Sequence, residues 1–132
     1  MLKVKNLSFQ YGSHQVLEDI DFAAPYGHCV AVLGNNGAGK STLIKCLNKI
    51  LSPRSGEVFL DERNLYTMSR TNLAKELAYV AQQSETARFT VFDTVMLGRK
   101  PYIKLSPSKK DYEIVHQMLE KLELTQIALA YI

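Results

Sequence analysis

Hydrophobic and polar residues alternate in two stretches near the start of the chain, at positions 4–11 and 16–22. Alternation of this kind is typical of strands that bury one face. A turn containing glycine, Gly12-Ser13, separates the two stretches. The pattern therefore predicts an antiparallel pair of strands.

An unbroken apolar run at positions 29–33 predicts a second kind of strand, buried on both faces of a mostly parallel sheet. Further apolar, turn and capping signals predict helix 40–51, strand 58–60, helix 69–75, strand 77–80, helix 91–97 and a helix that begins after Ser108. In this last helix Ser108 and Asp111 have capping-box spacing, and four apolar residues recur at helical intervals: Tyr112, Val115, Leu119 and Leu122. Because helices and strands interleave, the predicted fold class is α/β.

A glycine-rich stretch follows the apolar run and fits the pattern G-x-x-x-x-G-K-[ST]. Its residues are Gly34, Asn35, Asn36, Gly37, Ala38, Gly39, Lys40, Ser41 and Thr42. Glycines let the backbone N–H groups approach phosphate oxygens, and the helix that follows directs its unpaired N–H groups at the same anion. Lys40 would add a charge for the β- and γ-phosphates, and the Ser41 hydroxyl would bind Mg²⁺. The sequence therefore predicts a site for nucleotide phosphates.

Composition and charge limit the class of protein. The 132 residues are 46% hydrophobic and 22% charged, as expected for one globular domain. A net charge of +3, spread along the chain, does not favour a nucleic-acid partner. Cys29 and Cys46 are too few for a disulfide framework, and their predicted strand and helix make both expected core thiols. No apolar run approaches the length of a membrane span, and the N-terminus does not resemble a signal peptide.

The residues around the phosphate loop resemble the ATP-binding subunits of ABC transporters along essentially the whole chain. The similar stretches are Tyr11-Gly12 with 16–22, Ser52-Pro53 with 55–58, and 77–82. This resemblance implies a single, truncated ABC ATPase domain. It would comprise an antiparallel β-subdomain at about 1–26, a P-loop NTPase core at 27–83, and the Q-loop with the start of the helical subdomain at 84–132.

The resemblance also implies roles for individual residues. Tyr11 matches the aromatic residue that stacks on adenine, although a tyrosine at a strand end can simply pack. Thr42 would support the α-phosphate. Gln82 matches the Q-loop glutamine, which reaches Mg²⁺ and the attacking water, but the adjacent Gln83 leaves this assignment open by one residue.

Two positions, Asn35 and Ala81, depart from the family, which commonly has proline there. Neither change removes a group that contacts phosphate. Residues 90–102 resemble the segment after the Q-loop in importers of iron–siderophore complexes, haem and cobalamin, where this region lies against the permease. The implied cofactors are ATP and Mg²⁺, and the implied partners are a second ATPase subunit, in a homodimer, and transmembrane permease subunits. The implied location is the cytoplasmic face of the membrane.

One segment imitates the acidic strand that such an ATPase needs for hydrolysis. Residues 58–62 end in Asp61-Glu62, but the apolar run is short and matches the strand after the P-loop helix, so we expect a solvated turn there. The chain contains no Gly-Gly and hence no L-S-G-G-Q-like signature, and no histidine follows an acidic strand. We therefore expect the N-terminal part of a transport ATPase, inactive by itself. A naturally short, non-hydrolysing nucleotide-binding module and a soluble ABC-type ATPase remain the alternatives.

Overall fold

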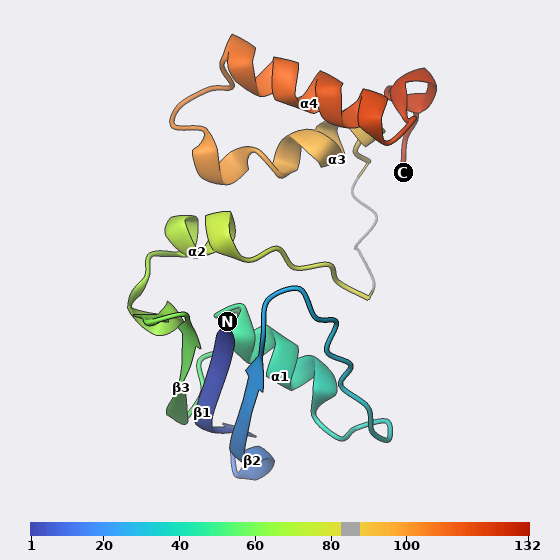
Figure 1. Ribbon diagram of the computed structural model, residues 1–132. Coiled ribbons are helices and arrows are strands. Elements are labelled where there is room, and N and C mark those ends of the chain that lie inside the picture. The colour runs from blue at the N-terminus through green and yellow to red at the C-terminus, as the bar shows by residue number, and fades with distance from the viewer. Residues whose placement is uncertain (83–87) are drawn as a thin grey trace. The chain divides into compact units, whose positions relative to one another are not determined.

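The computed structural model describes residues 1–82 and 88–132, which form two compact units, Met1–Ala78 and Tyr79–Ile132 (Figure 1). Gln83, the alternative to Gln82, lies outside the described residues. The first unit contains a sheet and the phosphate loop, and the second consists of helices.

An antiparallel sheet forms the body of the first unit. Its strands are β1 (Leu2–Tyr11), β2 (His14–Ala24), β3 (Ser55–Leu60) and β4 (Arg63–Asn64), in the spatial order β2-β1-β3-β4 (Figure 1). Tyr11 lies opposite His14 at the end of the β1–β2 hairpin. The predicted antiparallel pair is therefore confirmed.

The contact between β1 and β3 depends on a glycine. Gly56 has φ +93°, and a Cβ atom there would lie 2.4 Å from the carbonyl oxygen of Asn6 and 2.5 Å from the Cα of Leu7. Since both of these atoms belong to the backbone, no side-chain movement could make room. Only glycine allows the two strands to approach this closely.

Helix α1 (Lys40–Leu47) packs its apolar face against the core of this unit. The helix is shorter than predicted because Lys49 has a left-handed φ of +55°, which helical geometry does not allow. The Lys49 ammonium donates to the carbonyl oxygens of Tyr66 at 2.8 Å and Met68 at 2.7 Å. The side chain thereby ties the end of α1 to the 3-10 helix η1 (Leu65–Thr67) and the residue after it. Helix α2 (Arg70–Glu76) follows, with Ser69 as its N-cap, within one residue of the predicted helix 69–75.

Two predicted strands are wrong. Residues 29–33 and 77–80 form no strand, and Leu33 and Val80 are 88% and 92% exposed. A strand buried on both faces needs hydrogen-bonded neighbours, and no strand of the described residues pairs with either run. Cys29 is consequently exposed, which corrects its prediction as a core thiol, whereas Cys46 is fully buried as predicted.

The turn between β3 and β4 agrees with the prediction for Asp61-Glu62, because both residues are exposed. The Asp61 carboxylate accepts hydrogen bonds from the N-terminal ammonium of Met1 at 2.6 Å and from the Tyr26 hydroxyl at 2.7 Å. These two bonds lower the pKa of Asp61, the amino-terminal bond more strongly. The carboxylate therefore serves to hold the N-terminus against the turn.

The second unit consists of α3 (Val91–Leu97), the 3-10 helix η2 (Lys100–Tyr102), α4 (Lys109–Lys121) and the 3-10 helix η3 (Thr125–Ile127). Both longer helices begin with a capping box, Thr90 with Asp93 and Ser108 with Asp111. The second capping box and the bounds of α3 confirm the predictions. Val91, Val115 and Leu119 form the core, while the predicted apolar positions Tyr112 and Leu122 stay exposed. Within the described residues, no helix is both long and apolar enough to cross a bilayer.

Candidate nucleotide-phosphate site

The glycine-rich stretch forms a loop that enters α1, and three of its glycines have positive φ angles: Gly34, Gly37 and Gly39. Gly39 is the N-cap of α1, with φ +86°. A Cβ atom on Gly39 would lie 3.0 Å from both the Val16 carbonyl oxygen and Leu17 Cδ2. The helix start therefore lies directly against strand β2, at a distance that a side chain on Gly39 would not permit.

In the described part of the chain, no side chain caps the N-terminus of α1. Gly39 makes no side-chain cap, and the first turn contains no acidic residue. Helices normally satisfy their first N–H groups with a capping side chain, as α2, α3 and α4 do here. The amides at the start of α1, with the positive end of the helix dipole, are thus open to an anion.

Lys40 crosses the loop. Its ammonium donates to the carbonyl oxygens of Gly34 and Asn35, both at 2.7 Å. A further bond, from the Ala38 N–H to the Asn35 carbonyl at 3.2 Å, closes the turn inside the loop. The positive charge therefore sits within the ring of backbone formed by residues 34–39, where an exposed anion would meet both the ammonium and the amides.

Ser41 and Thr42 differ in how accessible they are. Ser41 is exposed in the first turn of α1, while Thr42 is buried at 9% exposure. No group of three or more His, Cys, Asp or Glu residues that could hold a metal occurs among the described residues. This donor set fits Mg²⁺ bound mainly through phosphate oxygens and water, with the Ser41 hydroxyl as a protein ligand, because Mg²⁺ retains several waters and needs few protein groups.

Tyr11 lies at the end of the β1–β2 hairpin and is half exposed. Its ring makes an edge-to-face contact with Phe9, with centroids 4.8 Å apart, and this contact leaves ring surface accessible. Because β2 begins at His14, opposite Tyr11, and contacts Gly39 through Val16, the hairpin end and the phosphate loop belong to the same side of the unit. An exposed aromatic ring and the phosphate loop thus lie on the same side of the first unit.

Gln82 is exposed and belongs to the second unit. The phosphate loop belongs to the first unit. Its assigned role in metal and water binding therefore stays a prediction.

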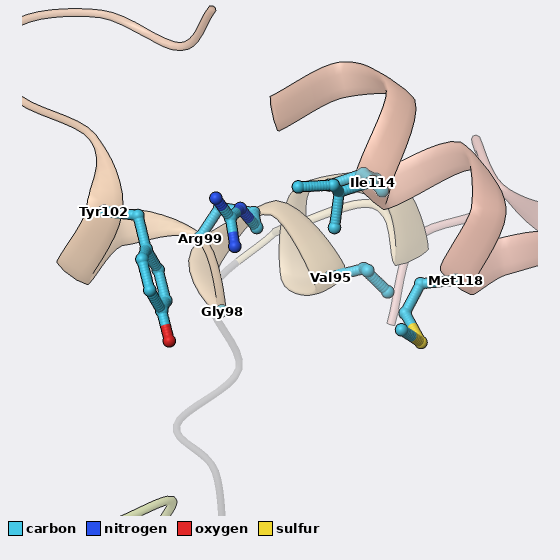
Figure 2. A pocket seen from close by; sticks show the side chains of 7 residues that line it. Val95, Gly98, Arg99, Tyr102, Ile114 and Met118 are labelled. Carbon is cyan, nitrogen blue, oxygen red and sulfur yellow. The ribbon is translucent and has the colours of Figure 1, made fainter. Parts of the chain in front are cut away.

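The second unit contains a pocket of about 300 Å³ between α3, η2 and α4 (Figure 2). Its lining is largely apolar: Val95, Gly98, Arg99, Tyr102, Ile114, Val115 and Met118. Figure 2 shows Val95 of α3 beside Met118 of α4, with the Tyr102 ring on the opposite side. The pocket includes part of the stretch 90–102 that the sequence singles out.

An ion pair forms the polar edge of this pocket. The Arg99 guanidinium donates to Asp111 Oδ1 through Nε at 3.1 Å and Nη2 at 3.0 Å. The other carboxylate oxygen accepts from the Ser108 hydroxyl and N–H. The Ser108 hydroxyl, then the Ser108 N–H, and then Arg99 lower the pKa of Asp111 to about 2. The Arg99 charge is therefore neutralised by a carboxylate fixed at the start of α4.

Sequence reasoning missed two of these relationships. Val16 and Leu17 pack against the start of α1 at Gly39. No local sequence pattern predicts a contact between residues so far apart in the chain. Arg99 binds Asp111 across twelve positions, which the capping-box spacing at Ser108 does not reveal. Each is a tertiary contact that depends on the fold.

Comparison with known proteins places these observations in a family. The chain matches the ABC transporter family over residues 17–132. It is 46% identical, over 131 residues and 99% of its length, to an ABC transporter ATP-binding protein of Methanocaldococcus jannaschii, of which it covers 52%. The chain thus spans about half the length of this relative.

Two further relatives are named for import. The chain is 32% identical to a petrobactin import ATP-binding protein of Bacillus subtilis, covering all of this chain and 53% of the relative. It is 37% identical to a hemin import ATP-binding protein of Bordetella pertussis, covering 96% of this chain and 48% of the relative. A solved ATP-binding subunit of an ABC transporter matches with a TM-score of 0.79 and 28% identity, over 99% of this chain and 54% of that subunit.

Proposed function

The chain belongs to the ABC transporter family as part of an ATP-binding domain with the ABC ATPase fold, and from this premise we propose that it binds MgATP at residues 34–42. In the full-length protein, hydrolysis of this ATP powers import across a membrane. The division of the chain into a β part, a P-loop core and a helical part belongs to the same proposal.

The start of α1 is the observation that carries the proposal. Helices α2, α3 and α4 each begin with a serine or threonine side chain as the cap, but α1 begins at an uncapped glycine. Lys40 adds a cation 2.7 Å from two loop carbonyls, so a triphosphate would exchange these contacts for charged oxygens. Uncapped amides, a helix dipole and an ammonium converge on one exposed loop.

Nucleotide binding by the purified chain tests this proposal directly. Lys40→Ala should weaken binding of a fluorescent ATP analogue at least tenfold, because it removes the ammonium that is hydrogen-bonded to the loop. Lys45→Ala provides the matched control, since Lys45 lies on the same helix but in its last turn. Equal affinities for the two variants would contradict the proposal.

The remaining site residues have separable roles. Tyr11 stacks on the base, Ser41 binds Mg²⁺, Thr42 supports the α-phosphate, and Gln82 links the metal and the attacking water to the permease. Tyr11→Ala should therefore lower affinity for ATP more than affinity for inorganic triphosphate, since only ATP carries a base. Ser41→Ala should reduce the gain in ATP affinity that Mg²⁺ produces.

Hydrolysis by these 132 residues alone is not part of the proposed activity. The chain has no L-S-G-G-Q-like signature, and the acidic pair Asp61-Glu62 lies in an exposed turn where Asp61 holds the N-terminus. We expect phosphate release no faster than that of Lys40→Ala. Robust release that depends on Lys40 would contradict this expectation and favour a complete catalytic site.

The transported substrate is an iron complex or cobalamin in this proposal. The relatives named for petrobactin and hemin import support the iron-complex class, and so does the stretch 90–102. Uptake of a labelled iron complex by cells that carry the full-length protein, with and without Lys40→Ala, measures this role. Unchanged uptake of iron complexes and of cobalamin would favour the soluble-ATPase or regulatory alternatives.

The proposed partners are a second ATPase subunit and a permease, at the cytoplasmic face of the membrane. The pocket between α3 and α4 is apolar and accessible, and it suits an apolar side chain presented by a permease loop (Figure 2). Met118→Asp, in the full-length protein, should prevent co-purification with the permease while ATP binding is retained. The control is Gln117→Asp, because Gln117 is exposed on the same helix as Met118. Met96→Asp is unsuitable as a control because Met96 packs on the core of the second unit.

A further inference from the structure

The excess of positive over negative charge lies in one short segment, the basic segment at residues 99–110. This segment contains five of the 16 basic residues and none of the 13 acidic ones. The remaining residues carry eleven basic and 13 acidic side chains, so outside the basic segment the chain is slightly negative. The net charge of +3 therefore originates entirely in the connection between α3 and α4, drawn in orange in Figure 1.

Four of the five cations are exposed lysines: Lys100, Lys104, Lys109 and Lys110. None of them forms an ion pair with a carboxylate in the part of the chain that the structure describes. The fifth, Arg99, is neutralised by Asp111 at 3.0 Å. Four ammonium groups thus present an uncompensated positive surface within eleven consecutive residues.

The placement of Lys109 and Lys110 opposes the stability of the helix that contains them. Both lie in the first turn of α4, at the positive end of its dipole, where acidic side chains stabilise and basic ones destabilise. Local arrangements that act against stability occur preferentially at functional positions. The two lysines therefore indicate a surface that meets an anionic partner.

An apolar side chain stands among these charges. Leu105 is fully exposed, at 101%. Tyr102, three residues earlier, is half exposed, and its ring centroid lies 4.3 Å from the Arg99 guanidinium carbon. Nucleic-acid binding would favour aromatic rings beside polar groups, while a leucine pointing into water is suited to insertion among acyl chains. Exposed cations around a protruding leucine are the combination that binds an anionic membrane surface.

We propose that the four lysines of the basic segment bind the anionic headgroups of a lipid bilayer and that Leu105 inserts below these headgroups. The lysines would supply long-range attraction, which falls off over about 10 Å at 0.1 M salt, and Leu105 would supply apolar burial at contact. The surface is distinct from the phosphate loop, which belongs to the other unit. The presence of a bilayer near this protein in the cell rests on the proposed function. Binding of the segment to anionic lipids does not depend on that function.

Co-sedimentation of the 132-residue chain with vesicles tests the proposal. The probes are vesicles of phosphatidylcholine with 30% phosphatidylglycerol and vesicles of phosphatidylcholine alone. We expect binding to the anionic vesicles at 0.05 M NaCl, loss of that binding at 0.5 M NaCl, and none to the neutral vesicles. Equal binding to both kinds of vesicle would overturn the proposal.

Two matched pairs of variants assign the binding to the segment. Replacing Lys100, Lys104, Lys109 and Lys110 by glutamine should weaken binding roughly 600-fold, about fivefold per lysine. The control replaces Lys3, Lys5, Arg70 and Lys121, four exposed cations elsewhere, and makes the same change in net charge. Leu105→Ser should weaken binding about tenfold, whereas Leu129→Ser, which alters another exposed leucine, should not.

Failure of this proposal can be told apart from failure of the proposed nucleotide site. Lys40→Ala should bind anionic vesicles as well as the unmodified chain does. The lysine variant should keep its fold, measured by far-ultraviolet circular dichroism, because removing Lys109 and Lys110 from the first turn relieves repulsion with the dipole. An equal loss of vesicle binding in the lysine variant and its control would overturn the proposal. So would binding to a single-stranded oligonucleotide that is tighter than binding to anionic vesicles and is unchanged in Leu105→Ser.

Discussion

Gly39 lies so close to Val16 that a methyl group on the glycine would come within 3.0 Å of the Val16 carbonyl oxygen. This contact sets the position of the α1 N-terminus relative to strand β2. The phosphate loop is therefore held at its helical end by packing against the sheet as well as by its own hydrogen bonds.

Gly39→Ala should lower the free energy of unfolding by about 2–3 kcal/mol, because it adds crowding against β2 to the cost of a positive φ. Gly37→Ala is the matched control, since Gly37 has a similar φ of +84° but open space around its Cβ position. It should lose only about 1 kcal/mol. Urea unfolding measures both, and a larger loss for Gly37→Ala would contradict the role of the Val16 contact.

Lys49 is held in a left-handed conformation by what its side chain binds. Lys49→Met should destabilise the chain by about 2–3 kcal/mol, because it keeps the strained φ and leaves two carbonyl oxygens without the ammonium. Lys49→Gly loses the same bonds but relieves about 1 kcal/mol of backbone strain. Thermal unfolding should therefore place Lys49→Gly between Lys49→Met and the unmodified chain. Variants as stable as the unmodified chain would show that the hydrogen bonds do not hold this turn, and a Lys49→Gly variant less stable than Lys49→Met would contradict the backbone strain.

Asp111 makes the stability of the helical unit depend on pH. Its pKa is lowered to about 2 in the folded chain from the ordinary value of 3.8, so its stabilising effect is present above pH 4 and is lost as the pH falls toward 2. The difference in stability between the unmodified chain and Asp111→Asn should shrink over this range in urea titrations. Glu113→Gln, which alters an exposed carboxylate on the same helix, is the control. A difference that is constant with pH would contradict the assignment.

The two cysteines should differ sharply in reactivity. Cys29 is exposed, while Cys46 is fully buried and burial raises its pKa to about 11. A maleimide at neutral pH should modify the folded chain once, and a second modification should require denaturant. Cys29→Ser should abolish the first modification, as measured by intact mass. Prompt labelling of that variant in its folded state would show that Cys46 is accessible.

Structural features that depend on neighbouring residues could be predicted from the sequence. Features that depend on contacts with distant residues could not. Ser108 and Asp111 determine a helix start by themselves, and this prediction is confirmed. The glycine-rich stretch likewise needs only its own residues to turn into α1. Residues 29–33 have the composition of a buried strand, but a strand forms only beside another strand, and Cys29 is exposed for the same reason. The net charge did not reveal the basic segment, because a sum over the whole chain does not show where the charged residues lie.

The apolar run at 29–33 leads directly into the phosphate loop, and this has a thermodynamic consequence. One end of the loop is fixed by α1, while the other continues into backbone without ladder hydrogen bonds within the described residues. The apparent affinity of a site equals its intrinsic affinity multiplied by the fraction of molecules that hold the binding geometry. Any strand that pairs with residues 29–33 would raise this fraction, so sheet completion and nucleotide affinity are linked quantities in this molecule.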